Sequence, residues 1–158
     1  MAIKENIYIV QVSNPNQKLA FQFMPEGVEN SRSANFSGIN IIGRNDDILQ
    51  FNGGSETLNF SIKFYSEKED RSDVKEKIDW LKSLTIRDGN NSEYQNVILV
   101  FGEMFLNYVW VVTNITQRPQ MFDESAEYRP IYAECNISLR LDPKTNLLWS
   151  DIRSGGLQ

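Results

Sequence analysis

The sequence predicts a mainly β domain with one flanking α-helix. Apolar and polar residues alternate with a period of two along Glu56–Phe64 and again along Ile131–Leu141, which is typical of strands with one buried face. The segment Arg71–Leu84 instead places its apolar residues at helical spacing. A chain of 158 residues, 41% of them hydrophobic, is the size of one domain with one core.

The two alternating strands have a well-defined register. Shifting either by one residue would turn charged side chains into the core, so the alternatives are disfavoured. The expected apolar face of the first strand holds Leu58, Phe60, Ile62 and Phe64. The expected apolar face of the second holds Ile131, Ala133, Cys135, Ile137, Leu139 and Leu141.

Three further stretches predict strands. Ile7–Val12 and Leu19–Met24 indicate an opening hairpin, because the turn-forming cluster Ser13–Asn16 separates them. Val97–Phe101 is a continuous apolar run, which favours a strand buried on both faces. We expect a second long strand after it, over Met104–Thr116.

The region between these elements predicts shorter strands. We expect Gly38–Ile42 and Ile48–Phe51, joined by the loop Gly43–Asp47. The pair Gly53-Gly54 superficially resembles a phosphate loop, yet it leads into Glu56–Phe64 rather than into a helix N-terminus. A bend or bulge is the better interpretation.

The helix has its own start and stop signals. Ser72 or Asp70 can cap its N-terminus, and a loop over Asp88–Ser92 ends it. Trp80 lies near the edge of the apolar stripe, where it is expected to pack on the rim of the sheet. The stripe consists of Val74, Ile78, Leu81 and Leu84.

We expect a domain over residues 1–141 and a C-terminal extension over residues 142–158. The extension opens with a turn at Asp142-Pro143-Lys144 and ends in glycines. Its apolar residues are Leu147, Leu148 and Trp149. They either fold back on their own domain or dock into a neighbouring subunit, as exposed apolar patches usually mark contacts.

Charge and composition exclude several classes of partner. The net charge is −5 and the pI is near 4.8, which argues against binding to nucleic acid or to an anionic membrane surface. No apolar run approaches the ~20 residues of a membrane span, and the N-terminus lacks the order of a signal peptide. With one cysteine there is no intramolecular disulfide, so we expect a soluble protein made in a cytoplasm.

The residues for catalysis are largely missing. There is no histidine, which removes the usual general base and the commonest zinc ligand, so we expect no catalytic, cofactor-binding or metal-binding residues and no cofactor. Cys135 lies on an apolar strand face, where packing is the expected role. The pairs Asp46/Asp47 and Asp123/Glu124 fit no calcium loop and are interpreted as solvated loop charges. Aromatic residues Tyr108, Trp110 and Tyr132 lack a basic neighbourhood and are expected in the core or at a subunit contact.

The order of the motifs resembles a known family. Phe21–Glu26 runs a strand into a Pro-Glu turn, and Ile41–Phe60 reads IIGRNDDILQFNGGSETLNF. An extended strand, a helix, an apolar strand ending in Phe-Gly, a Trp-containing strand and an alternating strand follow, up to Leu141. This series is similar to the tube-adaptor proteins of contractile injection systems, which occur in phage baseplates and phage-tail-like particles. Ile42 and Asp47 stand where many relatives have Pro, and no LysM module follows.

The resemblance implies a tail-tube-like fold, an antiparallel β-sandwich or small barrel with one helix on its flank. It also implies a structural, non-enzymatic subunit that forms a homo-oligomeric ring, with six copies expected, between the tail tube and the baseplate hub. Its partners would be itself and the tube and hub proteins, with DNA passing through the lumen without specific binding and no membrane. The expected location is the virion tail or baseplate, assembled in the cytoplasm of the bacterial host.

Two other interpretations remain open at this point. A stand-alone β-sandwich could bind a carbohydrate or a peptide on an exposed sheet, as a monomer with an aromatic-lined groove. A hydrolase with paired carboxylates is a third, although no spacing or motif in the sequence supports it.

Overall fold

The computed structural model describes residues 7–86, 94–105, 108–143, 150 and 153. Within these ranges the chain forms one seven-stranded antiparallel sheet and one α-helix, which confirms the predicted mainly β class with a single helix. The strand order is β2-β1-β5-β6-β7-β4-β3 and the sheet is not closed. The elements are β1 (Ile7–Gln11), β2 (Lys18–Ala20), β3 (Glu26–Ile39), β4 (Ile48–Tyr65), α1 (Ser72–Ser83), β5 (Asn96–Phe101), β6 (Val109–Asp123) and β7 (Arg129–Leu141).

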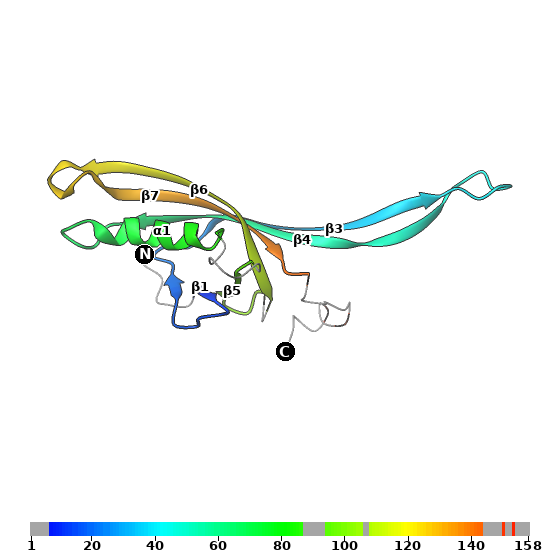
Figure 1. Ribbon diagram of the computed structural model, residues 1–158, viewed down its shortest axis with the longest axis horizontal. Coiled ribbons are helices and arrows are strands. Elements are labelled where there is room, and N and C mark those ends of the chain that lie inside the picture. Colours follow the sequence, from blue (N-terminus) through cyan, green and yellow to red (C-terminus); the bar gives the residue numbers. More distant parts are fainter. Residues whose placement is uncertain (1–6, 87–93, 106–107, 144–149, 151–152, 154–158) are drawn as a thin grey trace.

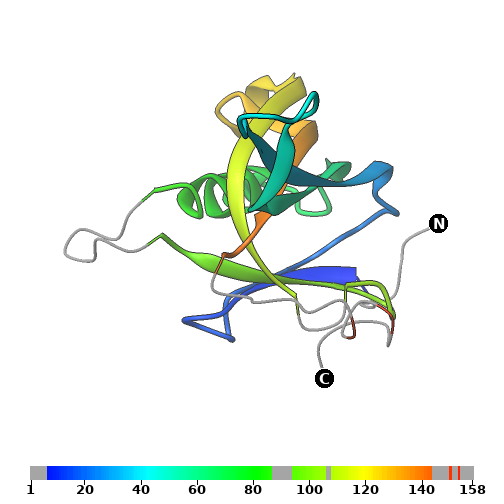
Figure 2. The same cartoon turned by 90° about the vertical axis from the view of Figure 1, so that its right-hand side faces the viewer.

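The core lies where the sheet curves around on itself. β1 and β5 lie across from β4 and β7, and α1 runs alongside them (Figures 1 and 2). The two alternating strands pair with each other, with Phe60 opposite Ile137 and Ile62 opposite Cys135. The predicted apolar face of β4 is buried, and that of β7 is buried except for the half-buried Ile131. From α1, the predicted stripe of Val74, Ile78, Leu81 and Leu84 joins this core, and Trp80 packs at its margin.

Two long hairpins dominate the shape (Figure 1). One is β6–β7, and the other is β3–β4, which projects far beyond the core (Figure 1). The prediction of two short strands, Gly38–Ile42 and Ile48–Phe51, is wrong, because strands of 14 and 18 residues form there. The polar segment 26–37 shows no buried face, and burial is what the period-two pattern reports.

The predicted bounds of the long strand that follows Val97–Phe101 are also corrected. β6 begins at Val109 rather than at Met104, and only three residue pairs join it to β5, from Asn96–Val111 to Ile98–Val109. β5 is fully buried on one face only, because Ile98 and Val100 are half-buried. The opening hairpin is confirmed, with β1 pairing β2 from Tyr8–Ala20 to Val10–Lys18, although β2 ends at Ala20 rather than at the predicted Met24.

Local hydrogen bonds define the start of α1 and the end of the domain. The N-cap of α1 is Arg71, in a left-handed conformation and without a side-chain cap hydrogen bond, so the prediction of Ser72 or Asp70 as the cap is wrong. The Asp70 carboxylate accepts a hydrogen bond from the Ser72 backbone N–H at 3.3 Å, one residue further on. At the other end of the chain, Asp142 is 1% exposed, and its Oδ1 accepts a hydrogen bond from the Tyr94 hydroxyl at 3.0 Å. The packed structure therefore includes Asp142. The predicted loop over residues 88–92 and the residues Leu147, Leu148 and Trp149 lie outside the described residues.

Candidate assembly surfaces

The β3–β4 hairpin carries exposed apolar side chains far from the core. We call residues 26–55 the arm, and every residue from Glu26 to Asn52 is exposed. A two-stranded hairpin is marginally stable on its own in water, and scattered exposed apolar residues are ordinary, but a concentration of them marks a contact. The exposed large apolar residues near its tip are Phe36, Ile39, Ile41, Ile42, Ile48, Leu49 and Phe51.

We call residues 36–51 the outer arm, and a β-bulge at its inner end determines which face each of these residues occupies. Ala34 pairs with Gly54, yet Phe36 pairs with Phe51, so two β4 residues lie opposite the single residue Asn35. Gly53 takes a left-handed conformation there, with φ of 86°. The predicted bend or bulge at Gly53-Gly54 is thereby confirmed. Gly54 has no room for a side chain, because a Cβ would lie 2.3 Å from the Ser33 carbonyl oxygen.

The bulge leaves the outer arm apolar on both faces. Phe36 and Phe51, with ring centroids 5.5 Å apart, continue the face that carries Leu58 and the core. Ile39 and its partner Ile48 belong to the opposite face. A strand pair with apolar residues on both faces is covered fully only when it lies between two layers.

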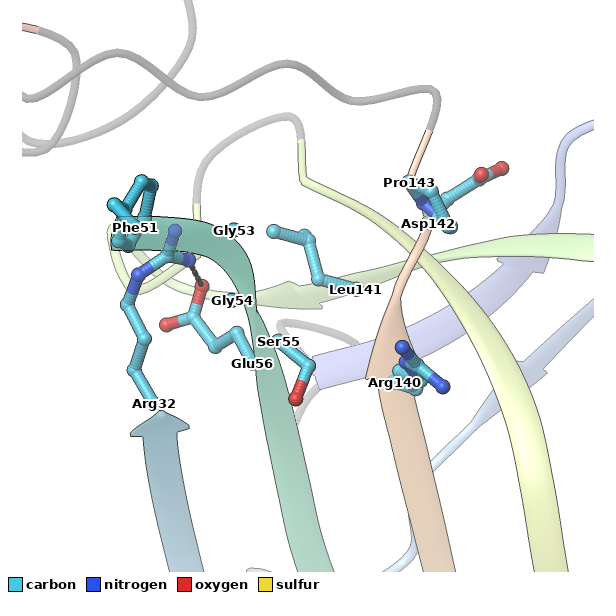
Figure 3. Close-up of a pocket in the computed structure, with 10 residues that line it drawn as sticks. All are labelled: Arg32, Phe51, Gly53, Gly54, Ser55, Glu56, Arg140, Leu141, Asp142 and Pro143. Carbon is cyan, nitrogen blue, oxygen red and sulfur yellow. Dashed lines mark ion pairs between the residues drawn. The ribbon is translucent and has the colours of Figure 1, made fainter. Parts of the chain in front are cut away.

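Polar contacts hold the arm together at its base (Figure 3). The Arg32 guanidinium lies 3.6 Å from the Glu56 carboxylate, and the Ser33 and Ser55 hydroxyls are 3.1 Å apart. A cavity of about 310 Å³ opens beside this ion pair, and its far wall is the end of β7, where Leu141 points toward Gly53 (Figure 3). The arm base thus adjoins the point where the chain leaves the domain.

Two strands of the sheet have long edges with no strand partner among the described residues. β3 pairs only with β4, and beyond Val111 β6 pairs only with β7. The four strands β6, β7, β4 and β3 alternate in direction, and because their number is even, β3 and β6 run opposite ways. An exposed edge is a template for pairing with another chain.

The same four strands share a polar face. Register places its β3, β4, β7 and β6 residues side by side, and the hydroxyl of Ser61 donates a hydrogen bond to the side-chain carbonyl oxygen of Asn136 across it. Uncharged Ser, Thr and Asn predominate, and the charged residues are three cations and three anions. The face consists of Glu26, Glu29, Ser31, Thr57, Asn59, Ser61, Lys63, Asn114, Thr116, Arg118, Glu134, Asn136, Ser138 and Arg140.

A groove lies between α1 and the turn end of the β6–β7 hairpin. Its volume is about 560 Å³, and Ile78, Pro119, Phe122, Tyr128 and Pro130 provide its apolar lining. Phe122 and Tyr128 are 53% and 66% exposed. We call this the α1 groove.

An ion pair and a hydrogen bond join the two walls of the groove, the start of α1 and the turn of the β6–β7 hairpin. Arg71 at the start of α1 lies 3.3 Å from the Asp123 carboxylate, and Arg129 donates a hydrogen bond to the Asp70 carbonyl oxygen at 2.9 Å. Hydrogen bonds from the Ser125 hydroxyl and from Arg71 lower the pKa of Asp123. Asp123 and Glu124, predicted as loop charges, thus differ in role, because Asp123 caps the turn Glu124–Ala126.

Cys135 and the three aromatic residues considered as stacking sites are buried in the domain. Cys135 is fully buried in the core, and burial together with Glu134 raises the pKa of its thiol to about 11. Tyr108, Trp110 and Tyr132 are all buried, so they offer no stacking platform. Within the described ranges, no group of three or more His, Cys, Asp or Glu side chains could hold a metal ion, and no helix has the length and apolar character of a membrane span.

Comparisons with known proteins give structural matches only. No family model matches the sequence, and no curated protein matches it. A chain of the anti-feeding prophage baseplate, a 6-fold symmetrised cryo-EM structure, is similar with a TM-score of 0.42 and 15% identity, over 90% of this chain and 92% of that one. A chain of the PVC sheath–tube complex, an extracellular contractile injection system in the extended state, is similar with a TM-score of 0.39 and 16% identity, over 90% of this chain and 88% of that one.

Proposed function

We propose that this chain is a structural subunit that closes into a ring with copies of itself, as an adaptor between the tube and the central hub of a phage or phage-like tail. The observation that carries the proposal is the pair of long, oppositely directed edges on β3 and β6. Copies related by rotation bring β3 of one beside β6 of the next, antiparallel. Closing a ring in this way removes both edges.

The place in the particle is supported by the series of motifs from Phe21 to Leu141, which resembles tube-adaptor proteins. By the same resemblance the ring has six copies, contacts tube and hub proteins, and is assembled in the bacterial cytoplasm. The extension from residue 142 onward is proposed to contact a neighbouring subunit.

The polar face is the side of the sheet suited to line the lumen, because the core side is covered by α1, β1 and β5 (Figure 2). The net charge of −5 is not carried by that face, where the cations Lys63, Arg118 and Arg140 are balanced by Glu26, Glu29 and Glu134. A lumen wall of this kind limits adhesion through its uncharged Ser, Thr and Asn side chains rather than through repulsion of DNA.

The test combines assembly state with amide hydrogen exchange. We expect light scattering on a size-exclusion column to give closed rings of one defined size, or stacks of a whole number of such rings. On assembly, amides of residues 26–39 and 113–123 should gain protection, whereas those of β4 and β7, already paired on both sides, should change little. A chain that stays monomeric and binds an oligosaccharide or peptide would contradict the ring and support the binding-module alternative.

A further inference from the structure

The arm and the α1 groove lie at opposite ends of the molecule's long axis, which gives copies a way to join end to end. In Figure 1 the tip of the β3–β4 hairpin and the turn end of β6–β7 point in opposite directions. The arm cannot reach the groove of its own chain. Any contact between them therefore joins two molecules, and it is heterologous because the two surfaces differ.

We propose that the outer arm of one copy docks in the α1 groove of a second copy. The inference rests on the proposed function in that copies of the chain must associate, and it goes beyond ring closure by naming an axial contact. Edge pairing of β3 with β6 acts between neighbours around a ring. Docking of arm into groove requires a displacement along the long axis, so it stacks one ring, or one chain, on the next.

The exposed area of the outer arm is what a stable interface needs. Its seven large apolar residues are between 38% and 102% exposed. At ~150–250 Å² for a whole aromatic side chain and somewhat less for Ile or Leu, they expose on the order of 700 Å². That exceeds the ~300–600 Å² of the largest patch on a typical monomer and approaches the ~800 Å² that each partner contributes to a standard interface.

The groove offers matching chemistry. Phe122 and Tyr128 line it and are exposed, and Pro119 and Pro130 line it as well; aromatic side chains of this kind are enriched where interfaces are anchored. The two lining cations are already engaged, since Lys75 pairs with Asp79 and Arg129 with Glu127. The apolar side chains of the outer arm can therefore enter without stranding a lining cation.

Two charge-introducing variants separate the two surfaces. Leu49→Asp with Phe51→Asp disables the arm, and Phe122→Asp with Tyr128→Asp disables the groove; all four side chains are more than half exposed, so the domain should fold. Met104→Asp, 54% exposed and in neither surface, is the matched control. Folding of each variant is checked by circular dichroism.

Sedimentation velocity distinguishes the outcomes. Wild type and control should form stacks, and each disabled variant alone should stop at the unit that edge pairing builds. When the two variants are mixed in equal amounts, the intact arms of the groove variant can dock only in the intact grooves of the arm variant. The mixture should therefore give pairs of units and nothing longer. Stacks of wild-type length from either variant, or no pairing on mixing, would overturn the arm–groove contact but not the proposed ring. A monomeric wild type at ~100 µM would overturn both the contact and the ring.

A cysteine cross-link tests the same contact directly. Cys135 is the only native cysteine and is buried, so Leu49→Cys with Tyr128→Cys places the reactive thiols on the two surfaces. Oxidation should give a ladder of linked chains on a non-reducing gel. Dimers from Leu49→Cys alone would instead show arm-to-arm contact, and a tube or hub protein cross-linked in place of the second copy would show another occupant; either result overturns the proposal.

Discussion

Replacing Gly54 by alanine should open the arm while leaving the domain folded. The new Cβ would lie 2.3 Å from the Ser33 carbonyl oxygen, where contacts under 3.0 Å essentially never occur, so the two backbones must separate by at least 0.7 Å. A ladder hydrogen bond of ~2.9 Å would stretch to ~3.6 Å, which is no longer a hydrogen bond. Losing one or two such bonds costs about 1–3 kcal/mol, or an increase of about 5- to 150-fold in the open population.

Hydrogen exchange followed by mass spectrometry measures this locally. Amides of the arm should exchange faster in Gly54→Ala, while the melting temperature stays close to that of wild type, because no described core residue lies between Phe21 and Leu58. Ser55→Ala is the control, since it removes only the 3.1 Å contact with the Ser33 hydroxyl and introduces no clash. Unchanged arm protection in Gly54→Ala would refute the steric argument.

Three more predictions concern the domain itself. Asp73→Ala should cost about 1–3 kcal/mol in chemical denaturation, because the carboxylate accepts hydrogen bonds from the Ser66 hydroxyl and the Glu67 N–H, both at 2.7 Å, while Asp79→Ala on the exposed face should change little. Burial alone would raise the pKa of Asp73, but these hydrogen bonds outweigh it and lower the pKa. The stability that Asp73 contributes is therefore fully present above the unfolded pKa of ~3.9 and is lost as the pH falls further. A loss of stability in Asp73→Ala that persisted at pH 2 would contradict this. With its pKa near 11, Cys135 should resist a chromogenic disulfide reagent at pH 8 until denaturant is added, and immediate reaction of the native protein would place the thiol outside the core. Removing residues 144–158, which spares the buried Asp142, should leave the melting temperature nearly unchanged and prevent co-assembly with hub or tube proteins, so a truncated chain that still co-assembles would end that proposal.

The parts of the fold that bury side chains could be predicted from the sequence. The alternation in Glu56–Phe64 and Ile131–Leu141 and the helical spacing of Val74, Ile78 and Leu81 all report contact with one core, and those elements form as expected. Trp110 was assigned to the core or to a subunit contact, and the structure buries it completely.

The arm could not be recognised in the same way, because it buries nothing within the chain. A segment such as Glu26–Ser37 becomes a strand through backbone pairing with β4, and backbone pairing leaves no hydrophobic period. One signal was available. Leu49 and Phe51 fall at odd positions and the core residues from Leu58 onward at even positions, so the two sets share one face only if a bulge lies between them.

The candidate surfaces were less predictable than the fold. The loop at Gly43–Asp47 was expected from its turn residues, but the groove formed by α1 and Tyr128 depends on contacts across the sequence, such as Arg71 with Asp123. The orientation of the polar face followed from the alternation, whereas its balance of charges became clear only when register placed Glu26 and Glu29 of β3 beside β4 and Arg118 opposite Glu134.

Cryo-EM of the purified oligomer tests the central claim most directly. The account predicts a closed ring in which β3 of each copy lies antiparallel to β6 of the next, with Thr116 and Asn136 on the wall of the lumen. A ring joined through α1 or β1, with β3 and β6 left unpaired, would contradict it, as would a particle containing a single copy of the chain.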